Sequence, residues 1–372
     1  MAYVAVKGGT EAIEASINLL NYERIKDKRI IEVETIISTM RSLVDQVMSE
    51  SSLYSPFLAA LAIKQAEGSM EEAVFLLRAH RSTLPRLYVS ESVDMNDMFV
   101  ERRISASFKD IPGGQLLGAT PDYKHRLLNF DLIDESAFHN EKLINQYKSA
   151  LPPYVNTTEV LRYPKVVEYL RKEGLFPTYE PNNEEPIDVT KENIRFPIAR
   201  SARLQMLTRG QTGAVTSLGY ASLRGYGAVH PTVGEVRFGS IPIHVNVQSE
   251  AEIDPDDSYY IGEIKLSEVE SFVPVTTSDE NGNDALHFEI GYGVCFGRNE
   301  TKAIAMSILD QCLEHPEIDF PTHDEEFVLL HIDSVESTGF ISHLKLPHYV
   351  TFQSKLDAVR NTKKERDTSE TN

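Results

Sequence analysis

The chain has 372 residues, 41% hydrophobic and 25% charged, which is typical of a folded globular protein and excludes a disordered one. Its formal net charge of −19 makes it a poor general binder of nucleic acid. Its two cysteines, Cys295 and Cys312, provide neither a disulfide framework nor the clustered thiolates of an iron–sulfur site. The sequence shows neither a signal-peptide pattern nor an apolar run of membrane-spanning length, so we expect a cytoplasmic, reduced protein.

Residues 1–93 are predicted to form a mainly helical region after a short initial strand. The stretch "EVETIISTMRSLVDQVMS" repeats apolar residues at helical spacing, which favours a helix with one buried face. Ser69 and Glu72 form the S-x-x-E pattern that opens a helix. We interpret these helices as core and scaffold.

Two glycine turns with neighbouring cations are candidate phosphate-binding elements. In "VKGGT", Lys7, Gly8 and Gly9 stand between strand and helix, where backbone N–H groups can face a phosphate. In "ERRISASFKDIPGGQLLG" the candidates are Arg102, Arg103, Lys109, Gly113 and Gly114. Cations beside a glycine turn suit a polyphosphate. "VKGGT" lacks the residue order of a Walker loop, and a strand-to-helix turn without a ligand is the favoured alternative for it. For the second stretch, the alternative is a tight turn with ordinary surface charges.

Residues 94–360 are predicted to form a mixed region in which short helices and antiparallel strands follow one another without βαβ alternation. Within it, the acidic and proline-rich segment 177–193 is a candidate linker or surface loop. The polar tail 361–372 is expected to be disordered. The expected fold class is therefore α+β, with a helical N-terminal region followed by this mixed region.

Between residues 195 and 237 all basic side chains other than histidine are arginines. This stretch holds six arginines, no lysine and a single acid, Glu235. Guanidinium groups bind phosphate or carboxylate through two parallel hydrogen bonds. Arg200, Arg203 and Arg224 are therefore candidate phosphate ligands. The alternative is that these arginines form salt bridges with the many acids elsewhere in the chain, and residue statistics do not separate the two interpretations.

Two further stretches carry candidate proton donors. "LRGYGAVHPTVGEVRFG" combines glycines, which allow close approach to a ligand, with His230 and Glu235 as candidate acid or base groups. A glycine turn before a strand explains the glycines but not the accompanying charges. "THDEEFVLLHIDSVESTGFISHLKLPHY" combines four histidines with carboxylates, a composition typical of divalent metal sites, and adds the candidate acids Asp324 and Glu325.

His343 and His348 are candidate metal ligands, although their spacing alone is weak evidence. On a helix, a step of five residues turns the side chain by roughly 140°, and on a strand it reverses the face. The two side chains can converge only if the chain bends between them, and Pro347 favours such a break.

Several of these stretches resemble one known family. "VKGG", "ERRISASFKDIPGGQLLG", "RGYGAVHPTVGEVRFG", "GYGVCFG" and "DEEFVLLHIDSVESTGFISHLKLPHYVTFQ" are similar to the PhnI subunit family of the bacterial carbon–phosphorus lyase complex. The resemblance extends from about residue 3 to about residue 357 and is weakest over 131–190 and 249–285.

The resemblance implies a role in alkylphosphonate breakdown. It implies that the subunit, with its partners, displaces adenine from ATP by a phosphonate such as methylphosphonate. The product is α-D-ribose 1-methylphosphonate 5-triphosphate. Alone, such a subunit is expected to act as a nucleosidase that releases the base from ATP or GTP, with water in place of the phosphonate.

Partners and cofactors also follow from the resemblance. It implies a complex with PhnG, PhnH and PhnJ subunits and contact with ABC-type ATPase subunits. PhnJ carries the radical iron–sulfur chemistry, in agreement with the missing cysteine cluster. It further implies zinc, or another divalent transition metal, at His343 and His348, and Mg²⁺ with the ATP. Neither a membrane nor nucleic acid is expected as a partner.

Residue types leave open which of His230, Glu235, Asp324 and Glu325 protonates the departing base. Two other functions also fit the sequence. One is a metal-dependent hydrolase centred on the histidines, and the other is a non-catalytic scaffold or metal-site subunit that presents a surface to PhnJ.

Overall fold

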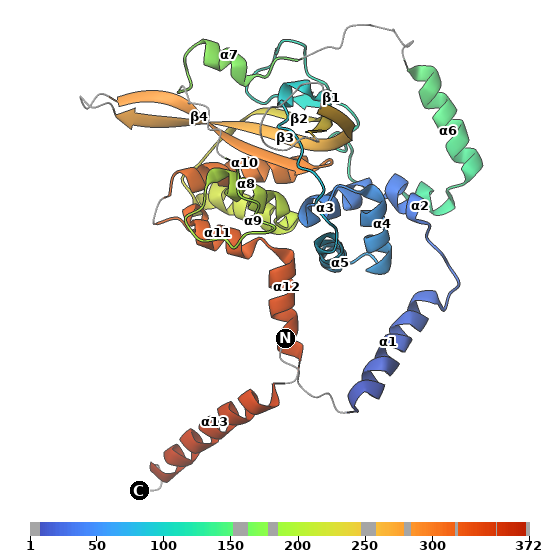
Figure 1. Ribbon diagram of the computed structural model, residues 1–372, viewed down its shortest axis with the longest axis vertical. Helices are drawn as coiled ribbons and strands as arrows, with labels where there is room; N and C mark the ends of the chain where they lie inside the picture. Colours follow the sequence, from blue (N-terminus) through green and yellow to red (C-terminus); the bar gives the residue numbers. More distant parts are fainter. Residues whose placement is uncertain are drawn as a thin grey trace.

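The computed structural model describes residues 8–151, 163–177, 185–246, 258–278, 284–316, 319–346 and 348–369. Helices precede an antiparallel sheet with helices packed on it, which confirms the predicted α+β class (Figure 1). Over the residues described, the helices are all too short or too polar to traverse a lipid bilayer.

The α-helices are α1 (Gly9–Ile25), α2 (Val33–Thr39), α3 (Arg41–Ser51), α4 (Pro56–Gln65), α5 (Met70–Ser82), α6 (Ala137–Ala150), α7 (Val167–Lys172), α8 (Arg200–Arg209), α9 (Thr212–Ala221), α10 (Glu300–Glu314), α11 (Glu325–His331), α12 (Ser334–Ser342) and α13 (Tyr349–Ser369). A π-turn, η3 (Ser222–Tyr226), extends α9, and a 3₁₀ turn, η6 (His343–Lys345), follows α12. The strands are β1 (Phe99–Ile104), β2 (Thr232–Asn246), β3 (Ser258–Ser278) and β4 (Asp284–Phe296).

The four strands form one antiparallel sheet in the order β1-β2-β3-β4, so every strand pairs with its neighbour in the sequence. Eight successive residues of β2, 234–241, are all buried. A strand buried at successive residues has both faces covered, because successive side chains point to opposite faces. The sheet is therefore the middle layer of the mixed region.

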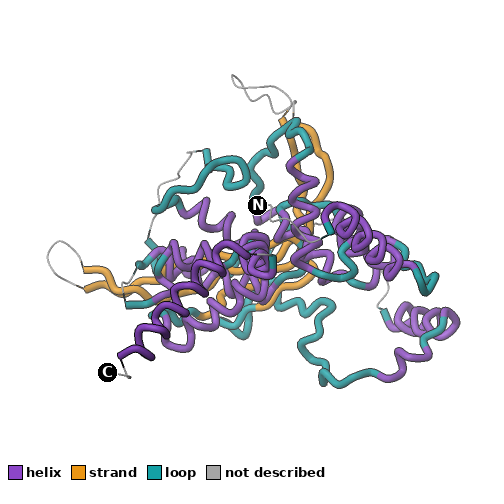
Figure 2. The backbone as a smooth tube through the Cα atoms, turned by 90° about the horizontal axis from the view of Figure 1, so that it is seen from below, coloured by secondary structure: helices purple, strands orange, loops and turns teal. Residues whose placement is uncertain are grey.

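Helices α8 to α11 cover one face of the sheet, and in Figure 2 helices lie across the strands. Their shared core includes Leu207, Val236, Val269 and Met306. Gly293 explains how closely α10 approaches β4, because a Cβ at that position would lie 2.0 Å from the backbone oxygen of Ala303. The second face is covered by α7 and its flanking loops, whose apolar residues pack around Phe272.

The N-terminal helices α2 to α5 have a separate core that contains Ile36, Val47 and Ile63. Ser69 caps α5 by accepting a hydrogen bond from the Glu72 backbone N–H at 3.5 Å, as the sequence predicts. Polar contacts join this bundle to the mixed region. For example, the Ser49 hydroxyl donates to the Thr208 carbonyl at 3.1 Å, across the α3–α8 interface.

Three helices stand away from the two cores. Helices α1, α6 and α13 contain no buried residue, and Figure 1 shows each of them outside the main body. Helix α13 continues through Ser369, so it enters the tail that is predicted to be disordered from residue 361. Part of the predicted linker 177–193 lies outside the described residues, and the proposed division at residues 93 and 94 stays a prediction.

Candidate functional site

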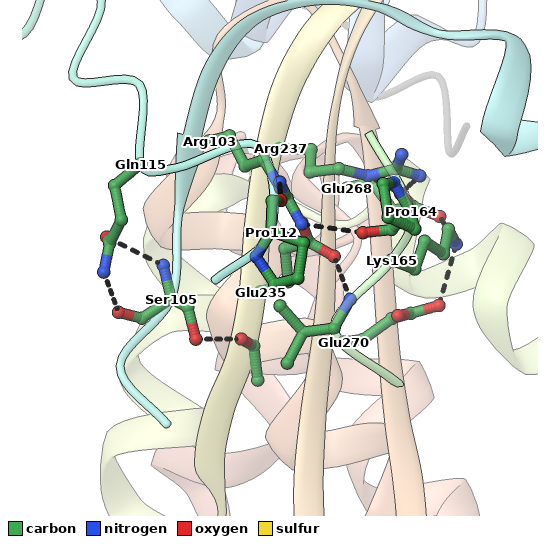
Figure 3. Close-up of polar contacts among 12 residues, drawn as sticks. Arg103, Ser105, Pro112, Gln115, Pro164, Lys165, Glu235, Arg237, Glu268 and Glu270 are labelled. Atoms are coloured by element: carbon green, nitrogen blue, oxygen red, sulfur yellow. Dashed lines mark hydrogen bonds and ion pairs between the residues drawn. The ribbon is translucent and has the colours of Figure 1, made fainter. Parts of the chain in front are cut away.

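Strand register gathers six polar side chains on one face of the sheet, which we call the charged face. Figure 3 shows its charged members, Arg103, Glu235, Arg237, Glu268 and Glu270. Glu235 of β2 pairs with Glu270 of β3, which pairs with Tyr292 of β4. Arg237, two residues after Glu235 on β2, pairs with Glu268 of β3 on one side and with Arg103 of β1 on the other. Because paired residues share a face, all six point away from α10 and toward α7.

Arg103 and Glu235 form an ion pair in the interior, with side chains 0% and 2% exposed. The Arg103 guanidinium also donates to the carbonyls of Pro112 and Pro164, at 2.6 and 2.7 Å. The other Glu235 oxygen accepts from the Val166 backbone N–H at 3.0 Å. Both carboxylate oxygens of this predicted acid are thus occupied. Glu235 holds the loops that cover the sheet, and its role in proton transfer stays a prediction.

A second group continues the charged face. Lys165 donates to Glu268 at 2.7 Å and to Glu270 at 2.8 Å, and Arg237 pairs with Glu268. The Tyr292 hydroxyl donates to Glu268 at 3.0 Å. Three cations and three carboxylates therefore balance within the charged face, since Arg103 and Glu235 form the remaining pair. A neutral buried network of this kind fixes one arrangement of loops over a sheet.

The two glutamates of this group differ in proton affinity. Burial alone raises the pKa of Glu268, but Arg237 and Lys165 outweigh it and hold that pKa below its ordinary value. Burial raises the pKa of Glu270 above its ordinary value, since only Lys165 neutralises it directly. Burial and the Glu268 carboxylate raise the pKa of Tyr292 well above its ordinary value. Of these two glutamates, Glu270 is thus the one that takes up a proton more readily.

Four residues of this group are not among those predicted from the sequence: Lys165, Glu268, Glu270 and Tyr292. The signal that could have found two of them is the alternation in "SEVESF", which puts both glutamates on one face of a strand. Lys165 lies in the loop before α7 and reaches the sheet only in the folded structure, so no local pattern links it to the strands.

Most of the predicted phosphate-binding arginines are already paired with carboxylates. Arg200 grips the fully buried Asp310 with two hydrogen bonds, at 3.1 and 2.5 Å. Arg203 pairs with Glu314 and approaches the predicted acid Glu325 at 3.7 Å. The structure thus favours the salt-bridge interpretation for these two positions of the arginine-only stretch.

Arg102 is also engaged internally, with Glu300 at 3.0 Å and Asp122 at 2.5 Å. Lys109 is exposed. Gly113 and Gly114 form a turn with positive φ, and a Cβ on Gly113 would lie 2.2 Å from the Tyr163 ring. Close packing therefore explains this glycine turn without a ligand.

The other predicted glycine turn is remote from the sheet. Gly8 and Gly9 lie at the start of α1, which stands apart from the main body (Figure 1), and Lys7 lies outside the described residues. The structure does not bring this turn together with the turn at Gly113.

Residues 226–228, before β2, contact residues 322–323, before α11. Three predicted site residues lie exposed beside this contact, and we call them the loop cluster: Arg224, His230 and Asp324. The Thr322 hydroxyl donates to the Tyr226 carbonyl at 2.6 Å. The Ala228 backbone N–H donates to Nε2 of the buried His323 at 3.1 Å. These bonds fasten the turn before β2 to the turn before α11.

Within the loop cluster the side chains differ in how they are held. Asp324 caps α11 by accepting from the Phe327 backbone N–H at 2.8 Å. Arg224 lies over the Tyr220 ring, 5.9 Å from its centroid. The fourth predicted acid, Glu325, accepts from the Ile198 backbone N–H at 3.1 Å. The loop cluster thus holds three of the predicted polar residues on the surface beside the turn before β2.

The histidine pair, His343 and His348, lies at the junction of α12 and α13, away from the sheet. The two ring centroids are 5.4 Å apart. Leu346 is extended between η6 and α13, so the chain breaks between the histidines as predicted, while Pro347 itself lies outside the described residues.

One ring nitrogen of each histidine in the pair contacts a backbone carbonyl. Nδ1 of His348 contacts the Leu346 carbonyl at 2.6 Å, and Nδ1 of His343 contacts the Phe340 carbonyl. A backbone carbonyl that fixes one ring nitrogen leaves the other available to a metal. Both residues are exposed, and the described part of the chain offers no third histidine, cysteine or carboxylate to complete a site.

The chain matches the model of the family described as bacterial phosphonate metabolism protein (PhnI) over residues 2–366. It is 41% identical over 375 residues to the alpha-D-ribose 1-methylphosphonate 5-triphosphate synthase subunit PhnI of Escherichia coli (strain K12), which covers 98% of this chain and 99% of that protein. It is 40% identical over 378 residues to the protein of the same name from Rhizobium meliloti (strain 1021), covering 99% and 96%. The chain therefore belongs to the PhnI family of bacterial phosphonate metabolism proteins.

Proposed function

We propose that this chain is a subunit of an α-D-ribose 1-methylphosphonate 5-triphosphate synthase within a carbon–phosphorus lyase complex. Its proposed reaction is the displacement of adenine from ATP by an alkylphosphonate, with release of the base to water when the chain acts alone on ATP or GTP. The observation that carries the proposal is the identity of about 40% with two synthase subunits over nearly their full lengths.

The reaction sets three requirements. Attack at the anomeric carbon of a β-nucleotide to give an α-product inverts the configuration, through a transition state with oxocarbenium character. The triphosphate must be held, the departing purine needs a proton, and the phosphonate must be positioned. The Mg²⁺ that accompanies ATP would, when bound, neutralise part of the triphosphate charge.

Among the predicted residues, the loop cluster fits these requirements best. His230 is exposed, and histidine is the side chain most often used as a general acid. The Asp324 carboxylate instead caps α11 by accepting from the Phe327 backbone N–H. Arg224 supplies an exposed guanidinium within the same cluster. We assign base protonation to His230 and phosphate contact to Arg224. Glu235 and Glu325 are bound by backbone N–H groups and serve less well as donors.

The histidine pair fits zinc or another divalent transition metal, held by the two Nε2 atoms and completed by water, substrate oxygens or a partner subunit. The histidine pair follows α12, at the end of that helix away from α11 and Asp324 (Figure 1), so we assign it no step of base displacement. The pair is instead assigned to a later stage of carbon–phosphorus bond cleavage.

The projecting helices support a role in a larger assembly. Exposed apolar residues recur on all three of them, including Ile17 and Leu20 on α1, Phe138 on α6, and Val350 and Phe352 on α13. Large apolar side chains left in water along whole helices mark protein–protein contacts. We assign these surfaces to the PhnG, PhnH and PhnJ subunits, with ABC-type ATPase subunits as further partners.

The test is product analysis by phosphorus NMR with ATP and methylphosphonate, for the purified chain alone and with co-purified partners. Base release without the ribose phosphonate is expected for the chain alone, because water at ~55 M wins unless the phosphonate is held in a closed site. The ribose phosphonate is expected with partners. Efficient formation of that product by the chain alone would contradict the need for partners. Absence of base release in every combination would instead support the scaffold function.

A further inference from the structure

An arginine cluster lies outside all the sites described above. It consists of Arg78, Arg81 and Arg86 from α5 and the segment after it, together with Arg209 at the end of α8. Two carboxylates lie among them. Asp333 pairs with Arg78 at 2.6 Å, and Asp188 pairs with Arg86 at 2.7 Å. Four guanidinium groups therefore face two carboxylates.

Two members of the arginine cluster lack a carboxylate partner. Over the residues described, neither Arg81 nor Arg209 forms an ion pair, and the Arg81 Nε is buried without a hydrogen-bond partner. Arg209 donates to the hydroxyl of Ser52 at 3.1 Å. Burial, followed by the cations Arg78 and Arg81, lowers the pKa of Arg209 to about 10. Burial also lowers the pKa of Arg81.

A cavity of about 310 Å³ adjoins the arginine cluster. Arg209 and Asp333 lie in its wall, together with apolar residues that include Phe196, Met206 and Leu329. Its volume lies at the lower end of the range for small-molecule sites. The wall also contains the exposed carboxylates of Glu192 and Glu336, which can accept hydrogen bonds from a ligand's amino group.

We propose that Arg81, Arg86 and Arg209 bind a tetrahedral phosphorus oxyanion beside this cavity, which holds any organic part of the ligand. Two unpaired guanidinium groups and one exposed guanidinium provide parallel N–H donors that match the oxygens of a phosphate or phosphonate. The oxyanion also gives Arg81 and Arg209 the counter-ion that no carboxylate of the described residues provides. Inorganic phosphate, a nucleotide polyphosphate and an alkylphosphonate share this chemistry. The proposal stands whether or not the chain is catalytic.

Direct binding to the full chain tests the proposal. Isothermal titration would use ATP, inorganic tripolyphosphate, methylphosphonate, inorganic phosphate and adenosine as separate ligands. We expect at least one phosphorus oxyanion to bind, and Arg81→Gln and Arg209→Gln each to weaken it by about 10-fold or more, since a charged hydrogen bond is lost. Arg171→Gln is the matched control, because Arg171 is an exposed arginine paired with Glu168 on α7.

The five ligands identify the source. ATP and tripolyphosphate binding equally well points to the phosphate chain, whereas ATP binding more tightly than tripolyphosphate shows that the cavity holds the base. Binding of methylphosphonate or inorganic phosphate alone points to a single oxyanion. Binding of adenosine that is unaffected by the arginine variants, with no oxyanion bound, overturns the proposal.

Two further variants separate binding from stability. Asp188→Asn releases Arg86 from its ion pair and is expected to tighten oxyanion binding. Ser52→Ala removes only the hydroxyl that Arg209 contacts and is expected to leave binding unchanged. Arg81→Gln is expected to keep or raise the melting temperature, because it relieves repulsion. A lowered melting temperature with unchanged binding in Arg81→Gln and Arg209→Gln would mean that the arginine cluster is only structural.

Discussion

Removing the carboxylate of Glu235 should destabilise the protein more than any surface substitution. In Glu235→Ala the Arg103 guanidinium, 0% exposed, keeps its charge but loses its counter-ion. An unpaired buried charge of this kind costs roughly 3–5 kcal/mol. Unfolding entropy of about 2.1 cal/mol/K per residue gives about 0.8 kcal/mol/K for 372 residues, so the melting temperature should fall by about 4–6 °C.

Thermal unfolding monitored by circular dichroism would measure this effect. Glu168→Ala provides the control, because it breaks the exposed pair with Arg171 and should shift the melting temperature by less than about 1 °C. Replacing both partners, as Arg103→Met with Glu235→Leu, should cost less than Glu235→Ala alone, since no charge is left unpaired. If Glu235→Ala melts like the control yet loses base release, Glu235 is the proton donor and the structural assignment is wrong.

Four other results are expected. His343→Ala and His348→Ala should each weaken zinc binding by about 10-fold or more, seen as a lower zinc content by elemental analysis after dialysis, while base release from ATP persists. Unchanged zinc content in both variants would refute a shared metal. Arg224→Lys should lower kcat/KM for ATP, because lysine cannot form the planar two-bond contact, and wild-type kinetics would rule out phosphate contact there. Glu268→Gln should lower the melting temperature at pH 7. The folded state holds the pKa of Glu268 below its ordinary value of about 4.5, so the ionised carboxylate stabilises the fold above that pH. This stabilisation is lost as the pH falls through the depressed pKa. Glu270→Gln should preserve or raise the melting temperature at pH 7. Because folding raises the pKa of Glu270, this glutamate destabilises the fold once the pH exceeds its ordinary pKa of about 4.5. The difference in melting temperature between the variant and wild type should therefore vanish below that pH.

The sequence was sufficient for the fold class and the family, and the reason is that both depend on local or contiguous patterns. Helical periodicity predicts the helical character of "EVETIISTMRSLVDQVMS", and the capping pattern at Ser69 predicts the start of α5, because these features involve residues within one or two turns. The break at Met40, which divides that stretch into α2 and α3, was not predicted. The quoted motifs were correctly identified as those of the PhnI family, since each is a continuous stretch.

Pairings between distant residues were not predictable from local patterns. Arg200 looks like a phosphate ligand in the sequence, but its partner Asp310 lies 110 residues away on α10. Arg103 and Glu235 were each proposed for substrate chemistry, and the strand register instead places them against one another. The break between His343 and His348 was predictable because proline acts on its immediate neighbours. Metal binding at the pair stays a prediction.

Tyr292 connects the two layers that the sheet separates. Its backbone N–H donates to Asp310 of α10 at 2.9 Å, while its hydroxyl, on the opposite face, donates to Glu268 at 3.0 Å. Because Gly291 and Gly293 on either side of it let α10 touch the backbone of β4, no side chain cushions the strand from the helix. Tyr292 is thus bonded to the helical layer through its backbone and to the ionic network through its side chain. A substitution that displaces α10 is therefore expected to disturb the charged face on the opposite side of the sheet.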